Sequence, residues 1–377
     1  MKILLNLLAA KQGGQVTRAR EFIKKFKFYS HKKDILIVLI SDSFPFKIRN
    51  EKSVKYIKIK FKYKKFNWLE RFIWENTKQI YLIKYLKPDI FLTFSHSLPL
   101  SRLDIPTIVG LSNLAPFSNL GFMKNSLMGK TRLLLLKYMI KISISKATAV
   151  IALSNYGKKI LIKNNIQKNK LYKISIGVKN QKKNTIITRS NYLKKKYILY
   201  VSHFYRYKNF EQLIFAYSNL PKITRLNYRL KLVGNFSDQK YLKYLKKLSN
   251  KLEVDNSIDF IPGVNEKILN SLYKKASLFI FPSRIENCPN ILLEAMSFGL
   301  PVLVAKTQPM PEFTGNVAKY FKLDDQIDLS KKINFLLSSK RILNYMSKMS
   351  YLKSKQYSWD LFTKKVIDLS RKTFLKK

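Results

Sequence analysis

Short runs of hydrophobic residues alternate along the chain with longer stretches in which apolar residues recur at helical spacing. Apolar runs bounded by polar residues are typical of buried strands, and the stretches between them, such as Gln15–Phe26 and Leu69–Leu86, predict helices. The predicted strands of the first half are Lys2–Leu8, Asp34–Ile40, Ile90–Phe94, Thr107–Leu111 and Ala149–Leu153. Those of the second half are Tyr197–Val201, Leu230–Val233, Ser257–Ile261, Leu278–Pro282 and Val302–Ala305.

This alternation predicts an α/β protein in which helices cover parallel sheets. The polar segment Asn180–Asn184 precedes a fresh strand and places a domain boundary within Gly177–Lys196. We therefore expect two doubly wound, Rossmann-like domains that face a cleft. Ligands of such sheets bind beyond the carboxyl ends of the strands, so the functional residues should lie in the loops there.

The net charge of the chain is large, but it is weak evidence of a nucleic-acid partner. Among 377 residues, 73 Lys+Arg stand against 22 Asp+Glu, which gives a formal net charge of +51. Only 13 of the cations are arginine and 60 are lysine. A surface that reads phosphates usually enriches arginine, whose planar group binds them through two bonds, whereas lysine is a solvated point charge. The lysine excess indicates a compositional bias, and we expect no nucleic-acid partner.

Cysteine content and hydropathy predict a cytoplasmic protein. Cys288 is the single cysteine, which excludes an intrachain disulfide and any site that needs several cysteine ligands. The apolar opening segment is broken by Asn6 and leads into Lys11, so it predicts a buried strand rather than a signal peptide. No uncharged run approaches the roughly 20 residues that span a bilayer. The protein can still associate with the inner face of the plasma membrane.

The segment Leu278–Val302 predicts a buried strand, a turn, a short helix and a second buried strand. Gly299 and Pro301 end the helix. Asn287 is positioned to cap its start, and Pro289 suits its first turn. A helix that begins at the carboxyl end of a strand can bind an anion through its free amide groups.

Two carboxylates accompany this predicted anion site. Glu286 lies before the helix and Glu294 within it. They would repel a phosphate unless they accept hydrogen bonds from neighbouring groups such as sugar hydroxyls. As an isolated pair they are better explained as a solvated residue at a helix start and another on a helix face.

The segment resembles the motif of two glutamates, separated by seven residues, of retaining glycosyltransferases with the GT-B fold, in the family 4 group. The resemblance implies that Glu286 contacts the donor sugar near the reacting centre and that Glu294 holds the nucleotide ribose. Many relatives have a glycine-rich turn after the first glutamate. This chain has Asn287, Cys288, Pro289 and Asn290 there. We place these four residues at the donor site, and the departure leaves the identity of the sugar open.

A second segment, Tyr197–Glu211, predicts a strand, a loop and a helix capped by Asn209. Arg206 and Lys208 lie just before the helix, where a guanidinium, an ammonium and the helix dipole can together hold a diphosphate. The family has a Lys-Asn or Lys-Gly pair at this point, so the resemblance implies that Lys208 binds the donor diphosphate. Arg206 is offset from the commonest arginine position, which His203 occupies here.

Three glycines fit the same resemblance. Gly13 and Gly14 follow the first predicted strand and resemble a loop whose backbone approaches the donor phosphates or sugar. A tight turn explains them equally well. Gly234 ends a predicted strand and resembles the glycine that borders the nucleotide base.

The resemblance covers nearly the whole chain, strongly over residues 197–312 and thinly before residue 147. It implies an acceptor-binding domain over residues 1–180, a nucleotide-sugar-binding domain over residues 181–355, and a closing helix over residues 356–377 that packs back on the first domain. The uneven match has a physical reason, because relatives share a kind of donor whereas the first domain must fit a particular acceptor.

Two polar residues at strand ends of the first domain are further candidates. His96 and Asn113 can contact the acceptor or the donor sugar, whereas His31 fits a solvated turn. No cluster of His, Asp or Glu suggests a metal site. We therefore expect no metal and no cofactor besides the nucleotide-diphosphate sugar, which is a co-substrate, with cations neutralising the leaving diphosphate.

The lysine-rich segments Lys47–Lys65 and Phe122–Ser145 can lie on an anionic membrane surface. A solvated strand and an amphipathic core helix explain them at least as well. If the acceptor is linked to a lipid, these segments of the first domain are where it would meet the membrane.

The sequence thus predicts a retaining glycosyltransferase that moves a sugar from a nucleotide-diphosphate sugar to a hydroxyl of a saccharide or lipid-linked acceptor. Cell-surface polysaccharide or lipopolysaccharide biosynthesis is the expected setting, with Glu286, Lys208 and Arg206 as catalytic residues. Two alternatives stay open. A sugar-nucleotide epimerase of the same architecture would need no acceptor, and a non-catalytic polyanion-binding protein would bind with a steep salt dependence.

Overall fold

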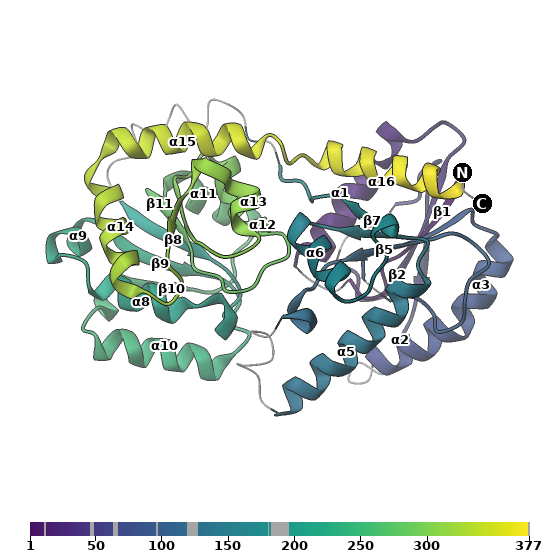
Figure 1. Cartoon of the computed structure of the whole chain (residues 1–377), viewed down its shortest axis with the longest axis horizontal. Coiled ribbons are helices and arrows are strands. Elements are labelled where there is room, and N and C mark those ends of the chain that lie inside the picture. The colour runs from purple at the N-terminus through teal and green to yellow at the C-terminus, as the bar shows by residue number, and fades with distance from the viewer. Residues whose placement is uncertain are drawn as a thin grey trace. The chain divides into compact units, whose positions relative to one another are not determined.

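The computed structural model describes residues 1–10, 13–45, 49–62, 67–95, 97–118, 127–179, 181 and 196–375. The chain divides into two compact units. The first is built from Met1–Phe117, Asn125–Gly177 and Trp359–Lys377, and the second mainly from Val178–Ser358. Figure 1 shows helices packed around the sheet of each unit.

The sheet of the first unit is parallel and has the order β3-β2-β1-β4-β5-β6-β7. Its strands are β1 Lys2–Asn6, β2 Ile35–Ser41, β3 Val54–Ile59, β4 Ile90–Thr93, β5 Thr107–Leu111, β6 Ala149–Ala152 and β7 Leu171–Lys173. Its helices are α1 Gly14–Tyr29, α2 Asn67–Asn76, α3 Lys78–Leu86, α5 Leu127–Lys146, α6 Asn155–Lys163 and α16 Trp359–Phe374. Strands β4, β5 and β6 are buried along their whole length, as expected when helices cover both faces of a parallel sheet.

The final helix α16 belongs to the first unit although the whole second unit separates it from that unit in sequence. It packs on α1, where Phe362 makes ring contacts with Phe22 and Phe94 at centroid distances of 6.4 and 5.9 Å. At the edge of this contact, the Lys25 ammonium donates to the Asp360 carboxylate at 2.8 Å. The core of the first unit is therefore completed by the end of the chain.

The second unit repeats the architecture with a parallel sheet of the order β10-β9-β8-β11-β12-β13. Its strands are β8 Tyr197–Val201, β9 Arg229–Val233, β10 Ile258–Ile261, β11 Leu278–Phe281, β12 Val302–Ala305 and β13 Lys319–Phe321. Its helices are α8 Phe210–Ser218, α9 Lys222–Asn227, α10 Gln239–Lys251, α11 Glu266–Lys275, α12 Asn290–Ser297, α13 Met310–Thr314, α14 Gln326–Ser338 and α15 Lys340–Ser354.

Aromatic rings fill the core of the second unit beside β8. The Tyr200 ring lies 4.6 Å from that of Phe210 and 6.1 Å from that of Phe281, and Phe204 stacks on Phe210 at 4.1 Å. All four side chains are at most 1% exposed. Such ring pairs stabilise the fold by more than the burial of their apolar area alone. The loop after β8 therefore begins at a well-packed part of the core.

The predicted fold class is confirmed, since both units are α/β with parallel, Rossmann-like sheets. Three strands at sheet edges, β3, β7 and β13, are absent from the predicted strands, although a solvated strand is one of the explanations given for Lys47–Lys65, where β3 lies. Each has at least one exposed residue that breaks the apolar run. The helix predicted over Leu69–Leu86 is two helices, α2 and α3, separated at Thr77, whose backbone leaves the helical region with φ −127° and ψ −86°.

Candidate active site

The second unit brings two predicted loops together at one point of its sheet. Strands β8 and β11 are neighbours, with β9 and β10 on one side of them and β12 and β13 on the other. At such a switch point the crossover connections leave in opposite directions, which opens a crevice at the carboxyl ends of the strands. Lys208 lies in the loop after β8, and Glu286 lies in the loop after β11.

Lys208 and Glu286 form an ion pair, with 2.5 Å between the lysine Nζ and the glutamate Oε1. Their side chains are only 13% and 12% exposed. Burial alone would lower the pKa of Lys208, but the Glu286 carboxylate and the nearby Tyr207 raise it above its ordinary value. The ammonium therefore stays charged across the physiological pH range.

The backbone around Lys208 is fixed by its neighbours. The loop forms a short 3-10 turn over Arg206–Lys208, after which Asn209 adopts a left-handed conformation with φ 60°. The Tyr200 hydroxyl donates to the carbonyl of Lys208 at 2.8 Å, and the Arg284 amide donates to the carbonyl of Tyr207 at 2.9 Å. The two loops are thus joined by a backbone hydrogen bond as well as by the ion pair.

Arg284 is a residue of this site that the sequence reasoning missed. Its guanidinium donates from Nη2 to the Asn209 Oδ1 at 2.7 Å and from Nη1 to the Asp324 carboxylate. Asn209 is fully buried and also donates to Gln212 at 2.6 Å. It therefore joins the two loops instead of capping α8 with its side chain as predicted. The available signal was an arginine three residues after the end of β11, which is easily overlooked in so basic a chain.

Arg206 does not join the ion pair. Its guanidinium carbon lies 5.2 Å from the ring centroid of Tyr241 and 5.9 Å from that of Tyr244, both on α10. The residue is exposed. A cation over two aromatic faces is held by cation–π attraction, so the structure places Arg206 toward α10 and Lys208 toward Glu286.

The start of α12 differs from the prediction. The helix begins at Asn290 with Pro289 at the N-cap position, so the expectation that Asn287 caps it is wrong. The Asn290 amide donates to the Cys288 carbonyl at 2.9 Å, and the helix begins two residues later than a cap at Asn287 would place it. Asn287, Cys288 and Pro289 are buried in the loop. The prediction that Gly299 ends the helix region is confirmed by its φ of 67° and its bond to the carbonyl of Met296.

Asn290 and Glu294 are the polar side chains on the first turns of α12. The Oδ1 atom of Asn290 is buried and has no hydrogen-bond partner within the described part of the chain. Glu294 accepts a long bond of 3.4 Å from the hydroxyl of Tyr273. Burial, followed by the charge of Glu294, raises the pKa of that hydroxyl, which therefore stays protonated and able to donate.

Gly234 and His203 lie where β9 and β8 end. A Cβ atom at Gly234 would lie 1.7 Å from the carbonyl oxygen of Ser202, so only glycine allows these loops to approach. Burial, followed by the charge of Lys208, lowers the pKa of His203. His203 is therefore a neutral group in the neighbourhood of the ion pair at neutral pH.

The remaining candidates belong to the first unit. Gly13 has φ 69° and directly precedes α1, which starts at Gly14. Asn113 follows β5, and its Oδ1 accepts a bond from the Ala115 amide at 2.9 Å. His96 lies outside the described residues, as do parts of the segments Lys47–Lys65 and Phe122–Ser145.

Neither a metal cluster nor a membrane span is found in the described ranges. No group of three or more His, Cys, Asp or Glu side chains there could hold a metal ion. No helix there is long and apolar enough to cross a membrane.

The part of the chain that contains this site matches a known protein family. Residues 181–353 match the family model described as "Glycosyl transferases group 1". That range covers most of the second unit and leaves the first unit outside it. Both Lys208 and Glu286, and the whole of α12, lie within it.

Two curated relatives are similar to part of the chain. An uncharacterized glycosyltransferase of Haemophilus influenzae is 28% identical over 179 residues, which cover 46% of this chain and 49% of that protein. The O-antigen chain mannosyltransferase B of Escherichia coli is 29% identical over 174 residues, 46% of this chain and 45% of that protein. The chain therefore matches about half the length of these relatives.

Solved structures share the fold over the full length. HepE of Anabaena, solved in complex with UDP and glucose, has a TM-score of 0.72 at 16% identity and covers 98% of this chain and 99% of its own. WaaG, a glycosyltransferase involved in lipopolysaccharide biosynthesis, has a TM-score of 0.75 at 16% identity with the same coverage. The chain has the two-domain GT-B fold.

Proposed function

We propose that this protein is a retaining glycosyltransferase that moves a sugar from a nucleotide-diphosphate sugar to an acceptor hydroxyl. The observation that carries the proposal is the largely buried ion pair of Lys208 and Glu286, with side chains 13% and 12% exposed, at the switch point of the second sheet. A buried pair that serves only stability gains little over apolar side chains. A cation and a carboxylate at the ligand-binding edge instead match a substrate with both phosphates and hydroxyls.

In the proposed mechanism Lys208 exchanges Glu286 for the donor diphosphate. The ammonium is charged beside Glu286, and a bound diphosphate would keep it so, which lets it stabilise the negative charge that develops on the leaving diphosphate. Glu286 is then free to accept a hydrogen bond from a hydroxyl of the donor sugar and to orient its ring. Arg206 is exposed on the same loop and can turn from its aromatic neighbours toward the diphosphate.

The acceptor hydroxyl attacks the anomeric carbon from the face that the diphosphate leaves. The carbon–oxygen bond to the diphosphate breaks as the new glycosidic bond forms, and the acceptor proton passes to the departing phosphate oxygen. The configuration is retained, and the step needs no protein nucleophile. Glu294 would hold the ribose, and the Asn287–Asn290 loop would contact the donor sugar. His96 and Asn113 of the first unit would contact the acceptor or the donor sugar. The backbone at Gly13 and Gly14 would approach the donor phosphates or sugar, and Gly234 would border the base.

The relatives support a setting for this reaction. The mannosyltransferase of Escherichia coli acts on an O-antigen chain by its name, and HepE was solved with UDP and glucose. We therefore propose a nucleotide sugar as the donor, a saccharide or lipid-linked acceptor, and a role in cell-surface polysaccharide or lipopolysaccharide synthesis.

A panel of nucleotide sugars tests the donor proposal. A ligand that binds only the folded chain raises its melting temperature, so at least one UDP-, GDP- or ADP-sugar should stabilise the wild type. Lys208→Met should remove that shift, whereas Lys243→Met, an exposed lysine on α10, should keep it. Proton NMR of the transferred sugar then tests retention. An inverted anomeric configuration would refute the retaining mechanism.

We also propose that the first unit contacts an anionic membrane at the inner face of the plasma membrane. Helices α2 and α3 each expose large apolar or aromatic side chains. Exposure is 61% for Trp68, 54% for Ile73, 74% for Tyr81 and 83% for Tyr85. Aromatic residues interleaved with lysines favour the interface of a negatively charged bilayer. A second copy of a chain with a net charge of +51 would instead be repelled.

Vesicle sedimentation tests this contact. The wild type should bind vesicles of phosphatidylglycerol and phosphatidylcholine and should dissociate at high salt. The double variant Tyr81→Ser and Tyr85→Ser should bind several-fold less. Tyr345→Ser, which removes a tyrosine that is 65% exposed on α15 of the second unit, should bind as the wild type does. Equal binding of all three proteins would refute the assignment of the surface.

A further inference from the structure

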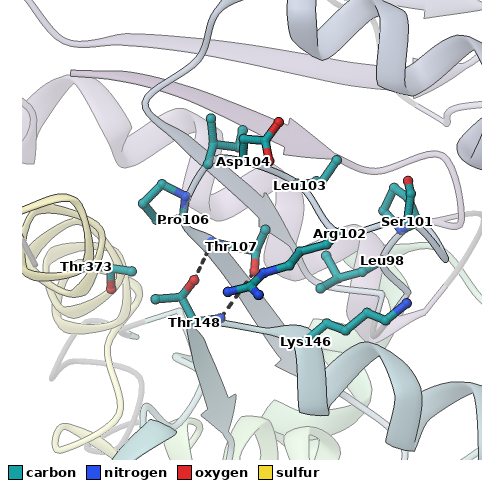
Figure 2. Close-up of a pocket in the computed structure, with 12 residues that line it drawn as sticks. Leu98, Ser101, Arg102, Leu103, Asp104, Pro106, Thr107, Lys146, Thr148 and Thr373 are labelled. Carbon is teal, nitrogen blue, oxygen red and sulfur yellow. Dashed lines mark hydrogen bonds between the residues drawn. The ribbon is translucent and has the colours of Figure 1, made fainter. Parts of the chain in front are cut away.

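A pocket of about 460 Å³ lies in the first unit (Figure 2). It is away from the carboxyl ends of the strands, where parallel sheets bind their ligands. It is lined by the loop between β4 and β5, by Lys146 at the end of α5, by Thr148 just before β6, and by Thr373 of α16. Thr107 and Thr148 stand at the amino ends of their strands, whereas substrates of parallel sheets bind at the carboxyl ends. The pocket is therefore distinct from the proposed active site.

The walls of the pocket are formed before any ligand binds. The Leu98 amide donates to the Ser143 hydroxyl at 3.1 Å, and the Leu100 amide donates to the Asn76 side chain at 2.6 Å. The Lys146 ammonium donates to the carbonyl of Leu100. These bonds fix the loop at several points, so ligand binding would need little ordering of the chain.

The floor of the pocket offers hydrogen-bond donors. Thr107 and Thr148 bond reciprocally, each hydroxyl accepting from the other's amide, at 3.1 and 3.2 Å. A hydroxyl that accepts one bond still carries its own proton, and neither proton has an acceptor among the residues that the structure describes. Arg102 is exposed, and its guanidinium also has no partner there. Figure 2 shows it beside the two threonines.

The charges around the pocket are close to balanced, and Arg102 is the positive group beside the threonine floor. Arg102 and Lys146 contribute two positive charges, and Asp104 contributes one negative charge at the other end of the pocket (Figure 2). The helices α5 and α16 end nearby, and each C-terminus carries a partial negative charge. Arg371 in the last turn of α16 is already paired with Asp34. The guanidinium of Arg102 is therefore the group that attracts an anion to the threonine floor.

We propose that this pocket binds the phosphate group of a small phosphate ester. A guanidinium fork and two hydroxyl donors match the several oxygens of a phosphate monoester. The volume lies within the about 300–1,000 Å³ of small-molecule sites and leaves room for an organic body. Leu98, Leu103 and Ile105 supply apolar walls for that body.

The pocket would link distant parts of the chain through its ligand. Its lining joins the β4–β5 loop to α16, the helix that returns to the first unit after the second. A bound phosphate ester would therefore stabilise the first unit. This inference does not depend on the proposed glycosyl transfer, because none of its residues belongs to the loops of the second unit.

Isothermal titration calorimetry of the full chain with phenyl phosphate tests the proposal. Wild type should bind at submillimolar to millimolar concentration, and phenol without the phosphate should not bind. Arg102→Gln should weaken binding about tenfold or more, as expected for a lost charge-assisted hydrogen bond. Arg102→Lys keeps the charge without the fork and should give an intermediate affinity. Arg132→Gln removes an exposed arginine of α5 outside the pocket and should bind as the wild type does.

The controls separate this site from the others. Both arginines are exposed, so the substitutions should leave the circular dichroism spectrum unchanged. If Lys208→Met abolishes phenyl phosphate binding and Arg102→Gln does not, the phosphate binds at the donor site and the proposal is wrong. Equal affinities for all variants, or no heat at millimolar ligand, would also overturn it.

Phosphatidic acid in a membrane carries the same phosphate monoester as a free metabolite, and a second arm distinguishes the two sources. Competition between phenyl phosphate and vesicles that contain phosphatidic acid should occur if the pocket takes a lipid headgroup. Binding that vesicles do not affect identifies a free phosphate ester as the ligand class. Vesicle binding that Arg102→Gln leaves unchanged, combined with unchanged phenyl phosphate affinity, would contradict both forms of the proposal.

Discussion

At the scale of single residues, Arg284 joins the two loops that carry the proposed catalytic pair. Its side chain is 8% exposed and holds the fully buried Asn209. We expect Arg284→Lys to lower the free energy of unfolding by about 1–3 kcal/mol, because it leaves a buried oxygen without its partner. Urea denaturation measures this change.

A matched control for Arg284 is available in the same unit. Arg229 pairs with Asp259, but its side chain is 48% exposed. Arg229→Lys should cost at most about 1 kcal/mol, as is usual for exposed ion pairs. If both variants are equally stable, Arg284 does not have the positioning role assigned to it.

His203 gives the pH dependence of stability a definite sign. Burial and the charge of Lys208 lower its pKa below the ordinary 6.5. Above pH 6.5 the imidazole is neutral in both states and contributes nothing. As the pH falls, the unfolded chain takes up the proton first, so stability decreases until the pH passes the lower folded pKa. His203→Gln should therefore reduce the loss of melting temperature between about pH 7 and pH 5. An unchanged loss would contradict the lowered pKa.

At the scale of elements, the junction of β8 and β9 depends on Gly234. The β-carbon of an alanine would lie 1.7 Å from the carbonyl oxygen of Ser202, at a backbone φ of 154°. The two strands would have to separate, at a cost of about 1–3 kcal/mol or more from the clash, in addition to the backbone strain. Gly315 also has a positive φ, 54°, but a β-carbon there meets nothing within 4 Å.

Thermal unfolding of the two variants checks this difference. Gly315→Ala carries backbone strain alone, about 1–3 kcal/mol, so Gly234→Ala should be the less stable of the two. The opposite order would show that the β8–β9 junction relaxes without loss.

The elements also show what the sequence can and cannot predict. The central strands β5, β8 and β12 were predicted at their exact bounds, because a strand buried on both faces reads as a continuous apolar run. Edge strands such as β3 alternate with exposed residues and are absent from the predicted strands. The start of α12 was misplaced, because the local turn at Cys288 is decided by packing in the loop and not by the capping preference of Asn287.

The same distinction applies to the candidate site. Lys208 and Glu286 were identified through their place after strands and their resemblance to a motif, and the structure brings them together. Arg284 was missed and Arg206 lies over α10, because the directions of long side chains depend on partners such as Tyr241 that are distant in sequence. The roles of all these residues in catalysis stay predictions.

At the scale of the whole molecule, the end of the chain completes the first unit. Phe362 is 1% exposed and packs on rings of α1, β4 and α16. We expect Phe362→Ala to destabilise the first unit by about 3–5 kcal/mol through loss of apolar burial and a residual cavity. Leu361→Ala, which removes a side chain that is 42% exposed on the same helix, should have little effect.

Scanning calorimetry distinguishes a local from a global effect of this change. The second unit has its own core, so its transition should stay in place while that of the first unit moves to lower temperature. A shift of both transitions together would show that the units unfold as one.

The largely buried pair of Lys208 and Glu286 is proposed to act on a nucleotide-sugar donor. Release of nucleoside diphosphate from the best donor of the panel tests this role in wild type, Lys208→Met and Glu286→Gln, each confirmed as folded. We predict a loss of at least about 100-fold in both variants, since a removed electrostatic stabiliser commonly costs that much. Wild-type turnover in both variants would contradict the account.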